Sequence, residues 1–200
     1  MRRLPLARTP RLALQRLLAL MGLLSLAPLA LPGPALAGEL AGVTMADTAT
    51  VGGQSLLLNG MGLREKYTID VYVGGLYLPS KTTSGSTAIQ QDVAKRITMH
   101  FIYKEVTAEQ MAETFHEGRA KLGDTTALEA RFAKLDSWLT DVHKGDVVTL
   151  DYVPGAGTTL SYNGTAKGTL EGADMMRALW SIYLGSSPAS KALKEGMLGL

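Results

Sequence analysis

The chain has 200 residues, with 20 Lys and Arg, 18 Asp and Glu and no cysteine. The absence of cysteine excludes disulfides, thiolate metal sites and a cysteine nucleophile. Five of the basic residues lie in the first 16 positions, which leaves 15 against all 18 acidic residues in the rest of the chain, and this acidic balance argues against nucleic-acid binding.

The first 37 residues have the pattern of a secretory signal peptide. An arginine-rich start is followed by an apolar run over residues 17–31 and by the small-residue motif Ala35-Leu36-Ala37. The run is short for a membrane span, and Pro28 and Pro32 break it. We predict a signal peptide over 1–37 and one domain over 38–200, periplasmic or secreted, with no stable membrane insertion after cleavage. A retained N-terminal anchor is the alternative.

The remaining residues predict strands, then helices, then strands and finally helices. Strands are predicted where β-branched and aromatic residues gather between turn residues, at 43–45, 54–58, 67–78, 96–103, 147–153, 158–162 and 166–170. Helices are predicted where apolar residues recur at helical spacing, from Thr107 to Leu122 and at 125–139, 173–184 and 188–198. The Ser- and Thr-rich segment 80–87 is predicted to be a surface connection.

Two local signals support this order. Thr107 is a good N-cap for the helix that follows it, and Asn163-Gly164 is a strong hairpin turn between two predicted strands. Because strands and helices are segregated without regular alternation, we predict an α+β domain with a layer of helices against one face of a mostly antiparallel sheet.

The segment 58–78 combines one arginine and several tyrosines with an apolar, strand-like sequence. Glycines at 60 and 62 precede Arg64, where we expect them to supply backbone freedom. A guanidinium is always charged and offers a fork of N–H donors. The segment therefore predicts an anion site beside an apolar cavity.

This segment also resembles the first signature of the chalcone isomerase-like family, in which an arginine follows a Gly-x-Gly turn and a strand then ends as Gly75-Leu76-Tyr77-Leu78 does. The segment 101–110, the motif Lys144-Gly145-Asp146 with the strand after it, and elements at 154–158, 163–164 and 184–194 resemble further parts of the family in its order. The resemblance spans most of residues 43–200. It implies an open-faced β-sandwich, one large antiparallel sheet covered by helices, with a ligand cleft between them.

The family contains isomerases and non-catalytic fatty-acid binders, and the resemblance implies site residues that favour the binders. Arg64 matches the family's arginine, and Tyr72 stands where the enzymes carry threonine and the fatty-acid binders carry tyrosine. The other polar positions of the enzymes fall near Thr107, Thr114 and Ile182. Most of the enzyme's tyrosine, asparagine and threonine set is therefore absent, so the resemblance favours a non-catalytic protein over an enzyme.

Arg64 and Tyr72 can hold one headgroup only if the chain turns between them. On one straight strand they would lie roughly 26 Å apart at ~3.3 Å per residue. We predict the turn at Glu65-Lys66. The alternative for Arg64 is an ion pair with Glu65 or Asp70, and the alternative for the tyrosines is a place in the strand core with their hydroxyls at its rim.

Three hypotheses for function remain open. The first is a binder of a fatty acid or similar amphipathic carboxylate; the second is an isomerase of the chalcone isomerase type acting on a phenolic substrate; the third is a structural or partner-binding protein without ligand. No cofactor is predicted, and His100, His116 and His143 lack the spacing of a zinc site. The oligomeric state is not predicted.

Overall fold

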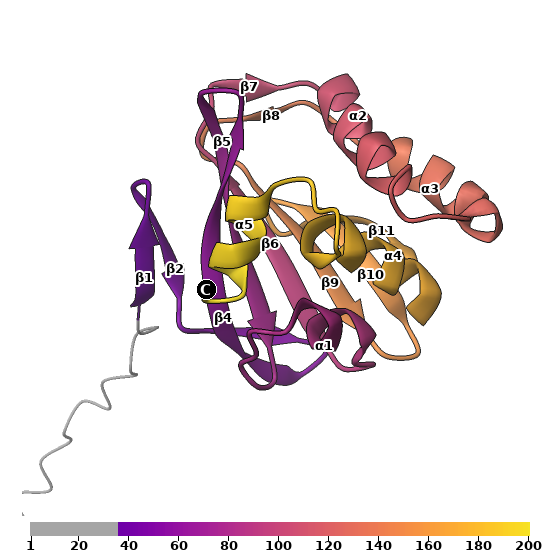
Figure 1. Cartoon of the computed structure of the whole chain (residues 1–200), viewed down its shortest axis with the longest axis horizontal. Helices are drawn as coiled ribbons and strands as arrows, with labels where there is room; N and C mark the ends of the chain where they lie inside the picture. The colour runs from indigo at the N-terminus through magenta and orange to yellow at the C-terminus, as the bar shows by residue number, and fades with distance from the viewer. Residues whose placement is uncertain (1–35) are drawn as a thin grey trace, which may run out of the picture. The chain divides into compact units, whose positions relative to one another are not determined.

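The centre of the fold is a seven-stranded antiparallel sheet. The structure, a computed structural model, describes residues 36–200 (Figure 1). Across the sheet the strands run in the order β11, β10, β9, β6, β5, β4, β3. Their bounds are β3 Thr48–Val51, β4 Gln54–Lys66, β5 Ile69–Leu78, β6 Lys95–Phe101, β9 Val147–Val153, β10 Gly157–Tyr162 and β11 Thr165–Leu170.

Two small antiparallel pairs lie outside this sheet. One is the hairpin of β1 Leu36–Leu40 and β2 Val43–Ala46, and the other joins β7 Glu105–Val106 to β8 Val142–His143. The predicted signal peptide lies outside the described residues except for Leu36 and Ala37, which begin β1.

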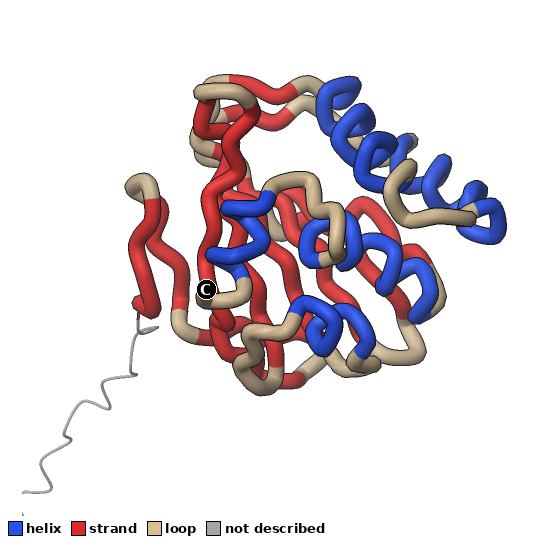
Figure 2. Tube along the Cα trace, viewed as in Figure 1, coloured by secondary structure: helices blue, strands red, loops and turns tan. Residues whose placement is uncertain are grey.

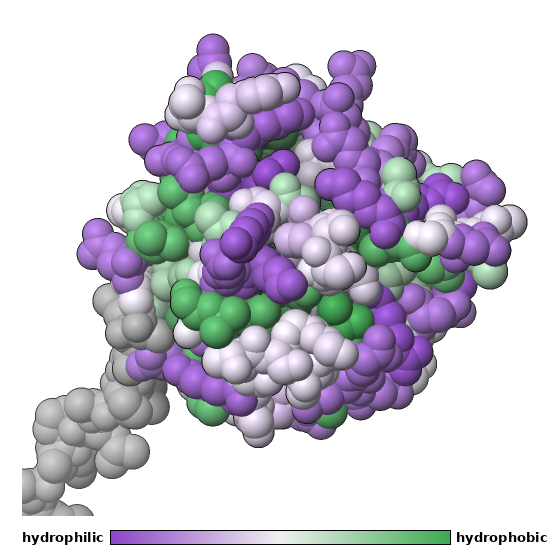
Figure 3. Space-filling view, in the orientation of Figure 1, coloured by the Kyte–Doolittle hydropathy of each residue, from purple (hydrophilic) through white to green (hydrophobic). Residues whose placement is uncertain are grey.

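The helices form a layer on one side of the sheet, which we call the helical face (Figure 2). They are α1 Gly85–Gln90, α2 Ala108–Arg119, the 3₁₀ turn η1 Thr126–Leu128, α3 Glu129–Asp136, α4 Ala173–Leu184 and α5 Lys191–Met197. The space-filling view of this side shows hydrophobic side chains in separate patches among hydrophilic ones (Figure 3). The predicted α+β class, a large antiparallel sheet covered by helices, is confirmed.

Local sequence explains most of these elements. Thr107 caps α2 in a capping box, because its hydroxyl accepts from Gln110 N while the Gln110 side chain accepts from Thr107 N. Asn163 and Gly164 have φ values of 48° and 79°, the left-handed conformations that a tight hairpin requires. The predicted bounds of β9 and α4 are confirmed.

Other boundaries differ from the prediction. β4 continues to Lys66 instead of ending at residue 58, and α1 begins at Gly85, inside the segment predicted to be a connection. Ser84 caps α1 by accepting from Thr87 N, so the Ser- and Thr-rich sequence starts a helix here. The predicted helix 125–139 is divided into η1 and α3, and the strands β1 and β3 were not predicted.

The side of the sheet opposite the helices, which we call the back face, has a small core of its own. Successive strand residues point to opposite faces, so Val73 and Tyr77 lie on the back face while Tyr72 and Leu76 belong to the main core. The β1–β2 hairpin covers this side: Met45 is 2% exposed, and Tyr77 donates a 3.0 Å hydrogen bond to Ala46 O. The open-faced sandwich is therefore partly covered on its second face.

Glycines in β4 allow α5 to lie directly against the strand. A methyl group on Gly62 would overlap the Leu193 carbonyl, and one on Gly60 would overlap the Gly196 carbonyl. Neither Gly60 nor Gly62 has a positive φ. The expectation that these glycines supply backbone freedom was wrong, because they supply room for close contact between two backbones.

Candidate ligand-binding site

A cavity of about 450 Å³ lies between the sheet and α2, with one wall residue from α4. Its size falls within the range of small-molecule sites. The lining residues come from β4 to β6 and the segments around them, from α2, and from the end of α4: Arg64, Lys66, Tyr67, Ile69, Val71, Tyr72, Met99, Phe101, Tyr103, Val106, Gln110, Met111, Glu113, Thr114, Phe115 and Tyr183. Both residues that the sequence singled out are among them.

Strand register brings Arg64 and Tyr72 together. They are direct partners in the antiparallel pairing of β4 with β5. The turn between them was predicted at Glu65-Lys66, but these residues still pair with Asp70 and Ile69. The chain turns one step later, at Tyr67, whose φ is 60°. The required turn is therefore present, and only its predicted position was wrong.

A register shift beside Arg64 shapes the cavity wall. The pairing moves by one residue between Arg64 and Glu65, which leaves Val71 of β5 as an extra residue. Such a bulge re-aims neighbouring side chains. Val71 and Tyr72, although consecutive, both line the cavity.

Arg64 is anchored on one side only. Its Nη1 donates to Ala189 O at 2.7 Å and to Glu65 O at 3.1 Å. Within residues 36–200, no carboxylate oxygen lies within 4 Å of its guanidinium nitrogens, and Nε and Nη2 donate no hydrogen bond. The alternative of an ion pair with Glu65 or Asp70 is therefore not observed, and Arg64 has donors to spare.

Tyr72 is a buried phenol next to this guanidinium. Its residue is 6% exposed, its ring packs on Phe101 with centroids 5.3 Å apart, and its hydroxyl has no hydrogen-bond partner among the described residues. Burial raises the pKa of Tyr72 to about 12, and the Arg64 charge opposes this rise. The hydroxyl is therefore neutral at pH 7 and can donate.

Tyr183 is a cavity residue that sequence reasoning missed. It lies at the end of α4, next to Ile182, the position to which the resemblance pointed. Its hydroxyl donates to Met99 Sδ at 3.6 Å, and burial raises the pKa of Tyr183 well above its usual value. One sequence signal could have indicated Tyr183. It lies in a mostly apolar helix, and the hydroxyl of a buried tyrosine needs a hydrogen-bond partner.

Comparison with known proteins agrees with this architecture. Residues 37–199 match the family described as chalcone isomerase-like. The chain belongs to the chalcone isomerase-like family. Among solved structures, a fatty-acid binding protein from Arabidopsis thaliana has the same fold, with a TM-score of 0.64, 18% sequence identity, and coverage of 78% of this chain and 92% of that one. A search of curated proteins gave no match.

The site of this chalcone isomerase-like protein has apolar walls and a charged rim. The walls are mainly Val71, Met99, Phe101, Val106, Met111 and Phe115. At the rim, Lys66 Nζ and Glu113 Oε2 form a 3.2 Å ion pair between the β4–β5 hairpin and α2. Tyr67, also at the rim, is 92% exposed. One end of the cavity thus carries charge, and the surface further in is apolar.

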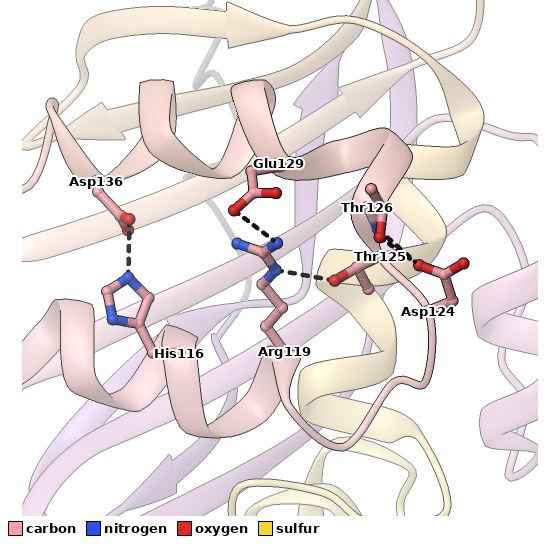
Figure 4. A network of polar contacts seen from close by, with 7 residues as sticks. All are labelled: His116, Arg119, Asp124, Thr125, Thr126, Glu129 and Asp136. Atoms are coloured by element: carbon pink, nitrogen blue, oxygen red, sulfur yellow. Dashed lines mark hydrogen bonds and ion pairs between the residues drawn. The ribbon is translucent and has the colours of Figure 1, made fainter.

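Helix α2, which covers the cavity, is held from behind by α3 (Figure 4). His116 Nε2 lies 2.8 Å from Asp136 Oδ2, and Arg119 Nε donates to Thr125 Oγ1 at 2.9 Å. The guanidinium of Arg119 also lies 4.9 Å from the centre of the Phe132 ring. The His116 side chain is 56% exposed, so it lies on the solvated face of α2 and also links the two helices.

The lining offers hydrogen-bond donors and few groups for acid–base chemistry. Of the described residues at the cavity, Glu113 is the one carboxylate, and Lys66 pairs with it. Thr114 turns its hydroxyl to Gln110 O at 3.0 Å, and Thr107 serves as the cap of α2. Within residues 36–200, no cluster of three potential metal ligands is found and no helix has the length and hydrophobicity to span a bilayer.

Proposed function

We propose that this protein binds a fatty acid or a similar amphipathic carboxylate without converting it, with the headgroup at Arg64 and Tyr72. The observation that carries the proposal is the Arg64 guanidinium at the edge of an apolar cavity. Only its Nη1 donates hydrogen bonds, and it has no carboxylate partner among the described residues. A neutral Tyr72 hydroxyl lies on the neighbouring strand. Both groups donate, so they fit an acceptor-only anion.

The carboxylate headgroup and the apolar tail of the ligand would contribute different amounts to the binding free energy. Charge-assisted hydrogen bonds from a guanidinium to a carboxylate contribute about 1.5–3 kcal/mol. Each CH₂ group removed from water contributes about 0.8 kcal/mol, so a chain of several such groups outweighs the headgroup. The tail against Phe101 and Met111 would supply most of the affinity, and Arg64 would supply orientation.

The comparison supports the same class of ligand. The Arabidopsis thaliana protein of this fold is a fatty-acid binding protein. At 18% identity the similarity shows the fold alone, and a fatty-acid ligand for this chain is part of the proposal.

The proposal includes export of the protein. The arginine-rich, apolar start of the chain supports a cleaved signal peptide over residues 1–37 and a periplasmic or secreted domain over 38–200. The N-terminal sequence of the protein recovered from the periplasm or medium tests this part, and an intact Met1 would contradict it.

Native mass spectrometry with identification of extracted ligands tests the binding. We expect a fatty acid bound to the wild-type protein and lost from Arg64→Ala. The matched control is Arg131→Ala, which removes an arginine paired with Asp174 outside the cavity. Equal ligand content in wild type and Arg64→Ala would contradict the proposal.

A chalcone isomerase-type activity is the second candidate. Arg64 and the Tyr72 hydroxyl favour it to the extent that they would also stabilise a developing oxyanion. The described lining lacks the asparagine and the second threonine that the resemblance attributes to the enzymes. Cyclisation of a chalcone by the purified protein, abolished in Arg64→Ala, would replace the first proposal with this one.

A further inference from the structure

We propose that Tyr183 is a third headgroup donor, and that its hydroxyl makes the site select an ionised acid over a neutral alcohol with the same tail. This inference rests on the proposed function and deepens it, because it names the residue that adds selectivity to Arg64 and Tyr72. Tyr183 comes from α4, so it approaches the cavity from the helical layer while the other two come from the sheet.

The hydroxyl of Tyr183 has a weak hydrogen-bond partner among the described residues. Tyr183 is 3% exposed, and its hydroxyl donates to Met99 Sδ at 3.6 Å. A thioether is a weak acceptor, and a buried hydroxyl gains from exchanging it for an oxygen. Met99 also lines the cavity, so a ligand that fills the cavity meets the hydroxyl and the sulfur together.

Hydrogen bonds to backbone carbonyls connect Arg64 with the end of α4, where Tyr183 lies. Arg64 Nη1 donates to Ala189 O at 2.7 Å, and Ala189 N donates to Ile182 O at 2.9 Å. Ile182 immediately precedes Tyr183 in the chain. Two positions after Tyr183, the Gly185 carbonyl accepts a 2.8 Å hydrogen bond from Lys194 Nζ. The guanidinium and the phenol are therefore parts of one connected arrangement.

Three donors converge on the site, and the charge of the ligand decides how well it uses them. All three side chains line the same cavity. Burial raises the pKa of both phenols, the Arg64 charge partly opposes that rise, and both hydroxyls stay neutral at pH 7. Two carboxylate oxygens offer about four acceptor positions and a negative charge. An alcohol offers a single oxygen and no charge, so it loses the charge-assisted bonds.

The test is isothermal titration of dodecanoate and of dodecanol into wild type and Tyr183→Phe. The substitution removes the hydroxyl and keeps the ring. We expect dodecanoate to bind about tenfold more weakly to Tyr183→Phe, a loss equivalent to about 1.4 kcal/mol, and dodecanol to bind both proteins equally. Tyr162→Phe is the matched control, because that hydroxyl is also buried but does not line the cavity, and it should bind both ligands as wild type does.

The outcomes separate this inference from the function on which it rests. Equal dodecanoate affinity in wild type and Tyr183→Phe would overturn the role of Tyr183 and leave the proposed function in place. Equal weakening for acid and alcohol would also overturn it, because the ring position would then matter and the hydroxyl would not. Failure of wild type to bind dodecanoate would overturn the proposed function and this inference with it.

Discussion

Two cations, the buried Lys95 and the partly buried Arg64, occupy different regions of this protein, and their surroundings differ in a way that separates structure from function. Lys95, under α1, is fully buried, and its Nζ donates to Ala88 O at 2.7 Å and Gln91 O at 2.6 Å. Arg64, beside α2, uses one nitrogen for two carbonyls and leaves the others without a partner in residues 36–200. In Figure 1 the helices α1 and α2 lie at opposite ends of the helical layer.

The difference lies in how completely each charge is satisfied. The Lys95 ammonium caps the last carbonyls of α1 and lies 5.8 Å from the Trp180 ring and 6.0 Å from the Tyr152 ring, so it is enclosed. The Arg64 guanidinium faces a cavity in which Glu113 is the one carboxylate among the described lining residues, and Glu113 is paired with Lys66 instead of Arg64. A cation enclosed by carbonyls and rings has no donor left for a ligand, whereas a cation with free donors beside a cavity is available to one.

The largest expected effect is on stability, in Lys95→Met. The substitution leaves the carbonyls of Ala88 and Gln91 without their donor, so we expect a loss of roughly 2–4 kcal/mol in the free energy of unfolding, with dodecanoate binding unchanged. Urea unfolding and titration calorimetry measure the two effects. Lys194→Met is the control, because that lysine donates to a single carbonyl, Gly185 O, and its loss should cost about 1 kcal/mol. A Lys95 variant with normal stability and weakened dodecanoate binding would contradict a purely structural role for Lys95.

The pH dependence of stability gives Lys95 a second signature. Burial lowers the pKa of Lys95 from 10.5 to about 8. Between these values the unfolded chain binds more protons than the folded one, so the lysine makes the free energy of unfolding rise with pH from 8 to 10.5. Lys95→Met should lack this rise in a series of urea unfolding curves. If the free energy of unfolding of Lys95→Met rose with pH as steeply as that of the wild type, the lowered pKa of Lys95 would be contradicted.

Close packing of α5 on β4 is expected to have the next effect, tested by Gly62→Ala. The added methyl group overlaps the backbone carbonyl of Leu193, so α5 must shift, and we expect a loss of about 1–3 kcal/mol. Because α5 follows Ala189, the shift should also weaken dodecanoate binding. In the control Gly38→Ala the nearest atom is Met61 Sδ at 3.2 Å, the flexible end of a side chain, so the loss should be smaller. Equal losses in the two variants would count against the close contact.

Tyr72 should show the pH signature opposite to that of Lys95. Its pKa is raised from 10.0 to about 12, so the stability that it contributes is complete below pH 10 and is lost as the pH rises through 12. Two pKa units correspond to at most about 2.7 kcal/mol. Tyr72→Phe should lose less stability than wild type between pH 10 and pH 12, as measured by urea unfolding. Parallel losses in the two proteins would place the Tyr72 hydroxyl in a solvated environment.

Arg64→Ala should have the smallest effect on stability and a clear one on binding. We expect dodecanoate to bind at least tenfold more weakly, which corresponds to about 1.4 kcal/mol, and dodecanol to bind as before. Loss of the bond to Ala189 O should reduce the free energy of unfolding by about 1 kcal/mol. Equal dodecanoate binding with a large loss of stability would make Arg64 a structural cation like Lys95.

Features set by short-range sequence could be predicted. The bounds of α4 and β9, the Thr107 cap and the Asn163-Gly164 turn depend on residues a few positions apart, and each was recognised. The pairing of Arg64 with Tyr72 was anticipated in part, because the distance along a straight strand required a turn between them.

Features set by long-range packing could not be predicted. The contact of α5 with Gly60 and Gly62 joins segments more than 130 positions apart, and the β1–β2 hairpin reaches the back face through Met45. Tyr183 enters the cavity only because α4 crosses the sheet at this point. Periodicity identifies the buried side of a helix but does not say which cavity that side meets.

The most direct measurement is a crystal structure of the protein with an ω-bromo fatty acid, in which the anomalous signal of bromine marks the end of the tail. The predicted result is a carboxylate in hydrogen-bond contact with Arg64 and Tyr72 and a bromine among the apolar walls near Phe101 and Met111. A bromine at Arg64, or a ligand outside the cavity, would contradict the account.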